Sequence, residues 1–432
     1  MNVAFQTLGC KVNHYESEAL MTLFKDAGFE VVDIRAVADV YVINTCTVTN
    51  QSDVKSRKAI RQAVQRNPEA VVAVIGCYSQ MDPAAIEAIE GVDIIMGTSQ
   101  RGRLIDLVFR YLRERRRQTL LDDVLHTDKM DELDVTGYEA MTRAYIKIQD
   151  GCNAFCSFCI IPFARGRMRS RPIASILQEA QRLIASGYRE LVLTGIHTGG
   201  YGEDLQDATL DTLLQRLAQY PDLERLRISS LEINQITDHF IEKLLPKAVF
   251  AKHLHIPLQS GSDSVLKRMR RRYTVAEYGK VIAKIRTQFP DLAITTDIIT
   301  GYPEETDAEF QETVATLKSL GFSELHVFPY SRRHGTPAAK VIGQIHGTIK
   351  SLRVNTLLSL NETLARTYRQ RFIGKHLDVL IETCGDGRCI GHSSEYIRVV
   401  VTTNEALENR RILATLIDDN YPLARARLEK TL

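Results

Sequence analysis

The sequence predicts an α/β protein with an amino-terminal parallel-sheet α/β domain, a central partial (β/α) barrel and a small carboxy-terminal all-β barrel. Three observations predict this. Apolar, β-branched runs alternate with amphipathic helix patterns through residues 1–125, and the same alternation returns in residues 138–370. Residues 371–432 hold only short alternating strands and turn signals. A chain of 432 residues is long enough for two or three domains at roughly 150 residues each.

The amino-terminal domain is expected to have a parallel sheet, because each predicted strand is followed by a helix pattern. The predicted strands are residues 2–10, 38–46, 70–77 and 93–98, and the predicted helices are residues 15–29, 54–68, 83–92 and 104–118. The acidic, polar stretch 122–137 reads as a linker to the next domain.

The central domain is expected to hold six parallel strands with helices between them, as in a full or partial barrel. These strands fall within residues 143–152, 190–196, 225–232, 253–262, 293–305 and 324–331. A helix over about 345–372 precedes the all-β strands at 376–385, 396–403 and 411–419.

The composition is ordinary for a soluble globular protein, and we expect the protein to be cytoplasmic. Hydrophobic residues make up 44% and charged residues 25% of the chain. No signal peptide opens the sequence, and no apolar run reaches the roughly 18 residues that a membrane span needs. The net charge of +2 is nearly neutral, so any nucleic-acid site must be a local patch.

Three cysteines share one topological position. Cys10, Cys46 and Cys77 each end a predicted strand of the amino-terminal sheet. The carboxyl ends of parallel strands meet at one edge of the sheet, where ligands bind, so these thiols should converge. Buried core cysteines are the alternative, but three at one position favour a metal site.

A second cysteine group is local in sequence. Cys152, Cys156 and Cys159 have the spacing C-x3-C-x2-C within "DGCNAFCSFCIIP". Zinc usually takes four ligands, and no histidine lies nearby in sequence to supply the fourth. Three thiolates on one loop suit an iron–sulfur cubane and leave one iron open. Cys384 and Cys389 are expected to be ordinary turn and strand residues, because even with His392 they make no set of four ligands.

The C-x3-C-x-aromatic-C motif, with Phe158 as the aromatic residue, resembles that of the radical S-adenosylmethionine (SAM) superfamily. The resemblance implies that the open iron chelates SAM. It also implies that the reduced cluster cleaves SAM to give a 5′-deoxyadenosyl radical. It also implies that SAM contacts Phe158, Gly195, Gln259 and Asp297. No catalytic residue beyond the cluster ligands is identified.

Over the whole chain, "GCKVN", "NTC" and "GCYSQ" ahead of that loop resemble the methylthiotransferases, whose carboxy-terminal domain is an RNA-binding TRAM module. The sequences of these motifs are similar to those of the branch that acts on N6-threonylcarbamoyladenosine in tRNA. The isopentenyladenosine branch would read nearer "GCQMN", and the ribosomal-protein branch nearer "GCPKN". Glu304 in "GYPEET" stands where the family has glycine, which bears on the backbone of that loop.

This resemblance implies two 4Fe-4S clusters, with SAM as both methyl donor and radical source. The expected reaction places a methylthio group on C2 of the modified adenosine 37, next to the anticodon. The expected partners are the tRNA anticodon loop and a flavodoxin- or ferredoxin-like electron donor, with the sulfur donor unidentified and no membrane involved. A methylthiotransferase that acts on isopentenyladenosine in tRNA or on a ribosomal protein residue is the alternative within this class.

Two basic runs are candidates for phosphate contacts. "RGRMRSR" places Arg165, Arg167, Arg169 and Arg171 directly after the cluster loop, and "KRMRRRY" spans residues 267–273. An arginine here is alternatively a partner for the carboxylate of SAM or of the threonyl group. A rival of a different class is a non-catalytic RNA-binding protein that holds zinc through these cysteines.

Overall fold

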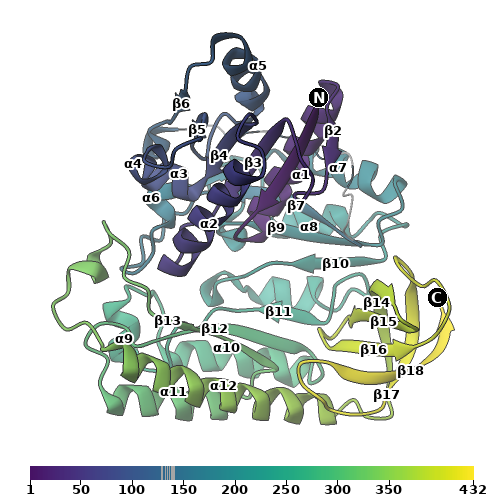
Figure 1. The fold of residues 1–432 in the computed structure, drawn as a ribbon. Coiled ribbons are helices and arrows are strands. Elements are labelled where there is room, and N and C mark those ends of the chain that lie inside the picture. Colours follow the sequence, from purple (N-terminus) through teal and green to yellow (C-terminus); the bar gives the residue numbers. More distant parts are fainter. Residues whose placement is uncertain (128–129, 132, 134, 136, 138–141) are drawn as a thin grey trace.

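The computed structural model describes residues 1–432 except 128–129, 132, 134, 136 and 138–141. Figure 1 shows three parts along the chain: the amino-terminal sheet with its helices, the central strands, and the small barrel near the carboxyl end. This is the α/β class that the sequence predicts.

The amino-terminal sheet is parallel and has six strands in the order β2-β1-β3-β4-β5-β6. Apolar residues fill β3 and β4, which are buried along their whole length, so these strands take the centre of the sheet. The strands are β1 (Asn2–Thr7), β2 (Glu30–Val32), β3 (Val40–Thr45), β4 (Val71–Gly76), β5 (Ile94–Met96) and β6 (Gln118–Leu120). The helices are α1 (Lys11–Asp26), α2 (Asn50–Arg66), α3 (Cys77–Met81), α4 (Pro83–Glu87) and α5 (Leu104–Glu114).

The central domain holds six parallel strands in two ladders, one of β7, β9 and β10 and one of β11, β12 and β13. A parallel bridge between Leu226 and Phe250 connects the two ladders, which gives an open partial barrel. The strands are β7 (Arg143–Asp150), β9 (Glu190–Gly195), β10 (Arg225–Ile228), β11 (His253–His255), β12 (Ala293–Thr300) and β13 (Glu324–Pro329), with a short antiparallel β8 (Arg169–Ser170).

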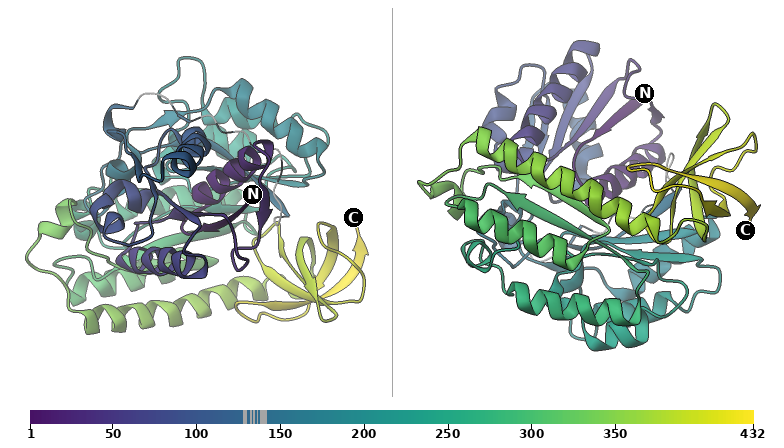
Figure 2. Two further views of the ribbon diagram at one scale, coloured as in Figure 1. Left: turned by 45° about the horizontal axis from the view of Figure 1, so that its top comes forward. Right: turned by 90° about the horizontal axis from the view of Figure 1, so that it is seen from below.

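Helices cover the outer side of these strands (Figure 2). The helices of this domain are α6 (Ile161–Arg165), α7 (Ile173–Ala185), α8 (Leu210–Leu217), α9 (Asp263–Arg268), α10 (Val275–Gln288), α11 (Asp307–Leu320) and α12 (Gly347–Gln370). The short α6 packs instead against α3 of the amino-terminal domain. The longest, α12, agrees with the helix expected near 345–372 and leads to the carboxy-terminal barrel.

The carboxy-terminal strands form a closed barrel in the order β14-β15-β16-β18-β17. They are β14 (His376–Gly385), β15 (Arg388–Ser393), β16 (Arg398–Thr402), β17 (Arg411–Leu416) and β18 (Ala424–Thr431). The sequence did not reveal β15 and β18, because the alternation of alanine and arginine in β18 carries little β propensity. Their pairing with the other strands closes the barrel.

Two details differ from the sequence predictions. Stretch 122–137 is not a free linker: Leu133 and Val135 are buried in the core of the central domain. The predicted start of that domain at residue 138 lies outside the described residues. Cys384 and Cys389, which face each other across β14 and β15, form a disulfide that was not expected. His392 instead contacts the carboxylate of Glu382 at 3.0 Å.

Among the described residues, no helix has both the length and the apolar character needed to cross a membrane.

Glu304 keeps a glycine-like backbone. Its φ is +62°, and its N–H donates to the carbonyl oxygen of Gly343 at 2.7 Å. A non-glycine residue with a positive φ of this kind costs about 1–2 kcal/mol of folding free energy. Glycine would recover only part of this cost, because it also increases the conformational entropy of the unfolded chain. Since the Glu304 side chain is exposed, Glu304→Gly is expected to raise the midpoint of thermal unfolding by about 1–2 °C. Glu304→Ala, which keeps the strain, should give no rise; equal midpoints for both variants would contradict this account.

Candidate active site

The first cysteine group, Cys10, Cys46 and Cys77, gathers at the carboxyl ends of β1, β3 and β4. Cys10 is the residue before α1, and Cys77 is the first residue of α3. Gly9 allows the close approach: its φ is +111°, and a Cβ there would lie 2.9 Å from the Cβ of Cys46. The structure thus brings together three thiols from separate parts of the sequence.

Burial favours the protonated form of two thiols in this first triad, Cys46 and Cys77, when no metal binds them. Burial raises the pKa of Cys77 to about 11, and burial also raises the pKa of Cys46. A metal or cluster that binds here must therefore displace protons. The guanidinium of Arg165 donates from Nε to the Sγ of Cys77 at 3.3 Å, a contact that favours the thiolate.

The second triad, Cys152, Cys156 and Cys159, lies on the loop between β7 and α6. The backbone N–H of Ala154 donates to the Sγ of Cys152 at 3.4 Å, and Arg271 donates to the Sγ of Cys156 at 3.2 Å. Burial raises the pKa of Cys152 to about 11 and that of Cys159 to about 12. Each triad therefore has one cysteine sulfur that accepts a hydrogen bond from a largely buried arginine.

The number of ligands in each triad favours a cluster over zinc. All six cysteines are free thiols. A structural zinc ion takes four ligands, whereas each triad supplies three thiols. A cubane, in which each thiolate binds a different iron, fits three thiols and leaves one iron open.

Both triads adjoin a cavity of about 740 Å³. Its wall includes Cys10 from the first triad and all three cysteines of the second, together with residues of β9, β11, β12 and β13. This volume is within the range of small-molecule sites. The cavity therefore lies where a reactant can meet both groups.

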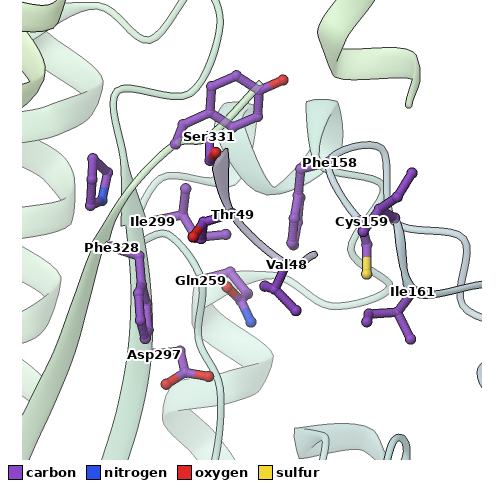
Figure 3. Close-up of a pocket in the computed structure, with 13 residues that line it drawn as sticks. Val48, Thr49, Phe158, Cys159, Ile161, Gln259, Asp297, Ile299, Phe328 and Ser331 are labelled. Carbon is purple, nitrogen blue, oxygen red and sulfur yellow. The ribbon is translucent and has the colours of Figure 1, made fainter. Parts of the chain in front are cut away.

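The four residues expected to contact SAM, Phe158, Gly195, Gln259 and Asp297, all line this cavity. A smaller adjoining cavity of about 240 Å³ includes three of them, with the rings of Phe158 and Phe328 on opposite sides and Gln259 between them (Figure 3). Gln259 has a φ of +68°, a strained backbone of the kind found at functional sites. Their contact with SAM stays a prediction.

Asp297 is held by two histidines. Its Oδ1 lies 3.3 Å from Nε2 of His255 and 3.2 Å from Nδ1 of His326. Burial alone would raise the pKa of Asp297, but the hydrogen bonds from both histidines outweigh it and hold the pKa well below the ordinary value.

The prediction that four arginines of "RGRMRSR" contact RNA is wrong for three of them. Arg165, Arg169 and Arg171 are buried, with exposed fractions of 0%, 5% and 1%. Arg171 pairs with Glu179 at 2.5 Å, and Arg169 donates to the carbonyl oxygen of Arg165 at 2.6 Å. Only Arg167 is exposed, so only Arg167 of the four is available to phosphate.

Arg165 belongs to a buried charge network between the first two domains. Its Nη1 lies 2.7 Å from Glu16 of α1 and 3.2 Å from Asp150 of β7. Lys147 bridges the same two carboxylates at 2.7 and 2.6 Å, and Arg101 pairs with Glu16 at 3.2 Å. Burial would raise the pKa of Glu16, but the surrounding cations lower it to about 2, so the carboxylate stays ionised.

The second basic run, residues 267–273, likewise contains both paired arginines and exposed basic residues. Arg271 turns inward, where it pairs with Glu232 and contacts Cys156, and Arg268 pairs with Glu309 at 2.8 Å. Lys267, Arg270 and Arg272 are exposed.

Two cavity residues were not revealed by the sequence. Lys11 follows Cys10 and lines the cavity. Tyr396 reaches the same cavity from the carboxy-terminal barrel, where its ring stacks on His253 with centroids 4.0 Å apart. The lysine in "GCKVN" was the available signal for the first, whereas the turn containing Tyr396 gave none.

Comparison with known proteins finds two family matches, and each of them contains one of the two cysteine triads. Residues 2–97 match the family described as "Uncharacterized protein family UPF0004", and residues 146–317 match the radical SAM superfamily. The chain is similar to the threonylcarbamoyladenosine tRNA methylthiotransferase MtaB of Bacillus subtilis, at 46% identity over 97% of this chain and 94% of that protein. The protein of the same name from Aquifex aeolicus is 37% identical over 88% and 93% of the two chains.

Two more distant matches are a tRNA-modifying relative with a different substrate in its name and a solved structure with a similar fold. The tRNA-2-methylthio-N(6)-dimethylallyladenosine synthase of Acetivibrio thermocellus is 33% identical over 87% of this chain and 79% of that protein. The solved structure of the radical SAM methyltransferase TsrM from Kitasatospora setae has a TM-score of 0.59 over 78% of this chain and 77% of that chain. At 18% identity, TsrM supports the fold alone.

Membership of the superfamily implies SAM and a 4Fe-4S cluster as cofactors. The full-length relatives supply the type of reaction and tRNA as its substrate. The chain therefore belongs to the radical-SAM tRNA methylthiotransferases.

Proposed function

We propose that this protein adds a methylthio group to C2 of N6-threonylcarbamoyladenosine at position 37 of tRNA, giving 2-methylthio-N6-threonylcarbamoyladenosine. The observation that carries the proposal is the arrangement of two cysteine triads beside one cavity. The names of the relatives with the highest identities quoted above favour this substrate.

In this proposal each triad holds a 4Fe-4S cluster. Cys152, Cys156 and Cys159 hold the cluster that binds SAM, and Cys10, Cys46 and Cys77 hold a second cluster for the sulfur to be transferred. SAM and the first cluster, when bound and reduced, supply the radical that removes hydrogen from C2. Such chemistry is needed because C2 of adenine has neither an acidic hydrogen nor a leaving group for acid–base catalysis.

The C2–H bond breaks and a C2–S bond forms. One SAM takes up one electron from a reducing protein of the flavodoxin or ferredoxin type and gives methionine and 5′-deoxyadenosine, which carries the hydrogen from C2. The C2 radical would bond to sulfur from a sulfide-level donor and release one electron, so the cleaved SAM is the net oxidant. A second SAM gives its methyl group to sulfur and leaves as S-adenosylhomocysteine.

In this proposal the cavity binds the nucleotide. The cavity is large enough for a nucleoside, and an anticodon-loop base can be splayed out of its single strand to enter it. Arg167 is the proposed phosphate contact, and the carboxy-terminal barrel is the proposed TRAM-like RNA-binding module.

The test is mass spectrometry of tRNA nucleosides from cells with and without the gene. Loss of 2-methylthio-N6-threonylcarbamoyladenosine, with accumulation of its precursor, is the expected result. Loss of the methylthiolated isopentenyladenosine instead would overturn the substrate assignment and favour the activity named for the Acetivibrio relative. If neither nucleoside changes, the proposed substrate is wrong and ribosomal proteins become the next target.

A further inference from the structure

Several of the charged groups that line the reaction cavity are paired with one another. Its carboxylates, Glu232 and Asp297, are already engaged, the first with Arg271 and the second with His255 and His326. Arg271 is likewise occupied by Glu232 and by the sulfur of Cys156. These groups compensate one another.

Lys11 is the exception. Among the residues that the structure describes, it is the only lysine that lines this cavity, and its side chain is exposed. Its ammonium forms no hydrogen bond or ion pair with another described residue. The 16-residue helix α1 begins at Lys11 and lacks a side-chain cap, so the positive end of the helix adds to the same field.

We propose that Lys11 binds the carboxylate of the threonylcarbamoyl group and thereby selects the modified adenosine. This inference rests on the proposed function. The ammonium, at the end of a flexible four-carbon chain, is a point charge suited to one carboxylate. An apolar isopentenyl substituent would leave it without a partner in a partly enclosed cavity, which disfavours that substrate.

The placement fits the substrate. Cys10 and the second triad border the region where C2 is proposed to react. The threonyl group is attached through N6 on C6, and only N1 separates C6 from C2, so the substituent and C2 lie along the same edge of the adenine. Lys11 follows Cys10 directly but carries its charge away from the backbone on its long side chain. One residue pair in "GCKVN" therefore contributes both a proposed cluster ligand and a proposed substrate ligand.

The test measures RNA binding and does not depend on turnover. Two anticodon stem-loops are compared by fluorescence anisotropy on reconstituted protein without SAM: one carries N6-threonylcarbamoyladenosine and the other its methyl ester, which lacks the charge. Wild-type protein should bind the acid more tightly by roughly tenfold, as expected for a charge-assisted hydrogen bond. Lys11→Gln should bind both stem-loops equally, with the affinity of wild type for the ester.

Arg167→Gln is the matched control. As an exposed candidate for phosphate contact, Arg167 should affect acid and ester equally and lower the salt dependence of binding by about one unit. Iron content and the electron paramagnetic resonance spectrum of Lys11→Gln establish that its neighbour Cys10 still holds a cluster. Lys11→Arg, which keeps the charge, should retain most of the preference for the acid.

Three outcomes would overturn the proposal. Persistence of the acid preference in Lys11→Gln would exclude Lys11 as its cause, and equal weakening for acid and ester would make Lys11 a phosphate contact. Weaker binding of SAM in the absence of RNA would assign Lys11 to the carboxylate of SAM. Failure of the proposed function is distinguishable, because the nucleoside analysis of cells would then identify another substrate.

Discussion

Cys156→Ala is expected to abolish the reductive cleavage of SAM, whereas Cys46→Ala should stop methylthiolation and leave SAM cleavage in place. The physical reason is that the two triads are separate. Cys156 shares a loop with Cys152 and Cys159, while Cys46 directly follows β3 in a different domain. Loss of even an outer partner of a metal ligand costs about 10–100-fold, so loss of a ligand should reduce the affected step by more than roughly 100-fold.

The measurement is 5′-deoxyadenosine formed by reduced, reconstituted protein, with methylthiolated nucleoside measured in parallel. Cys384→Ser is the control, since Cys384 belongs to neither triad, and both products should form at the wild-type rate. Loss of SAM cleavage in Cys46→Ala to the same extent as in Cys156→Ala would contradict independent roles for the two triads.

Arg165→Met is expected to destabilise the protein by about 3–5 kcal/mol, the usual cost of removing one partner from a buried ion pair. Arg165 is fully buried and pairs with Glu16 and Asp150, which are also buried. Methionine fills a similar volume but leaves these carboxylates with fewer cations. The measurement is the urea midpoint of cluster-free protein followed by circular dichroism.

Two further variants test the cause of that loss. Arg167→Met, two residues away and exposed, should change stability by no more than about 0.5 kcal/mol. Arg165→Met and Glu16→Gln together remove both partners of one pair, so the double variant should lose less stability than the sum of the two single losses. If the double variant is as unstable as the sum of the single ones, lost packing is the cause rather than an unpaired charge.

The sequence predicted the fold class, the convergence of Cys10, Cys46 and Cys77 and the local loop with Cys156. These are properties of one strand end or one short spacing, which a single stretch of sequence carries. The ends of parallel strands meet at one edge whatever the rest of the domain does.

The burial of the arginines was not predicted, because their partners are distant in sequence. Alternate arginines resemble a solvated surface, and Arg165 is buried only because Glu16 reaches it from α1. The acidic partners of these arginines did carry a signal in the sequence. Glu179 lies among the buried apolar residues of α7, and a carboxylate in such a place requires a cationic partner.

The position of Tyr396 has a consequence for how the enzyme is made. This ring lines the reaction cavity but belongs to the barrel of β14–β18, which the ribosome completes long after both cysteine triads have emerged. At about 5–20 residues per second, the triads wait on the order of 10–50 s for this part of the wall. During that interval the cavity lacks one part of its wall, so we expect iron and sulfide to reach the thiols more easily before the barrel docks.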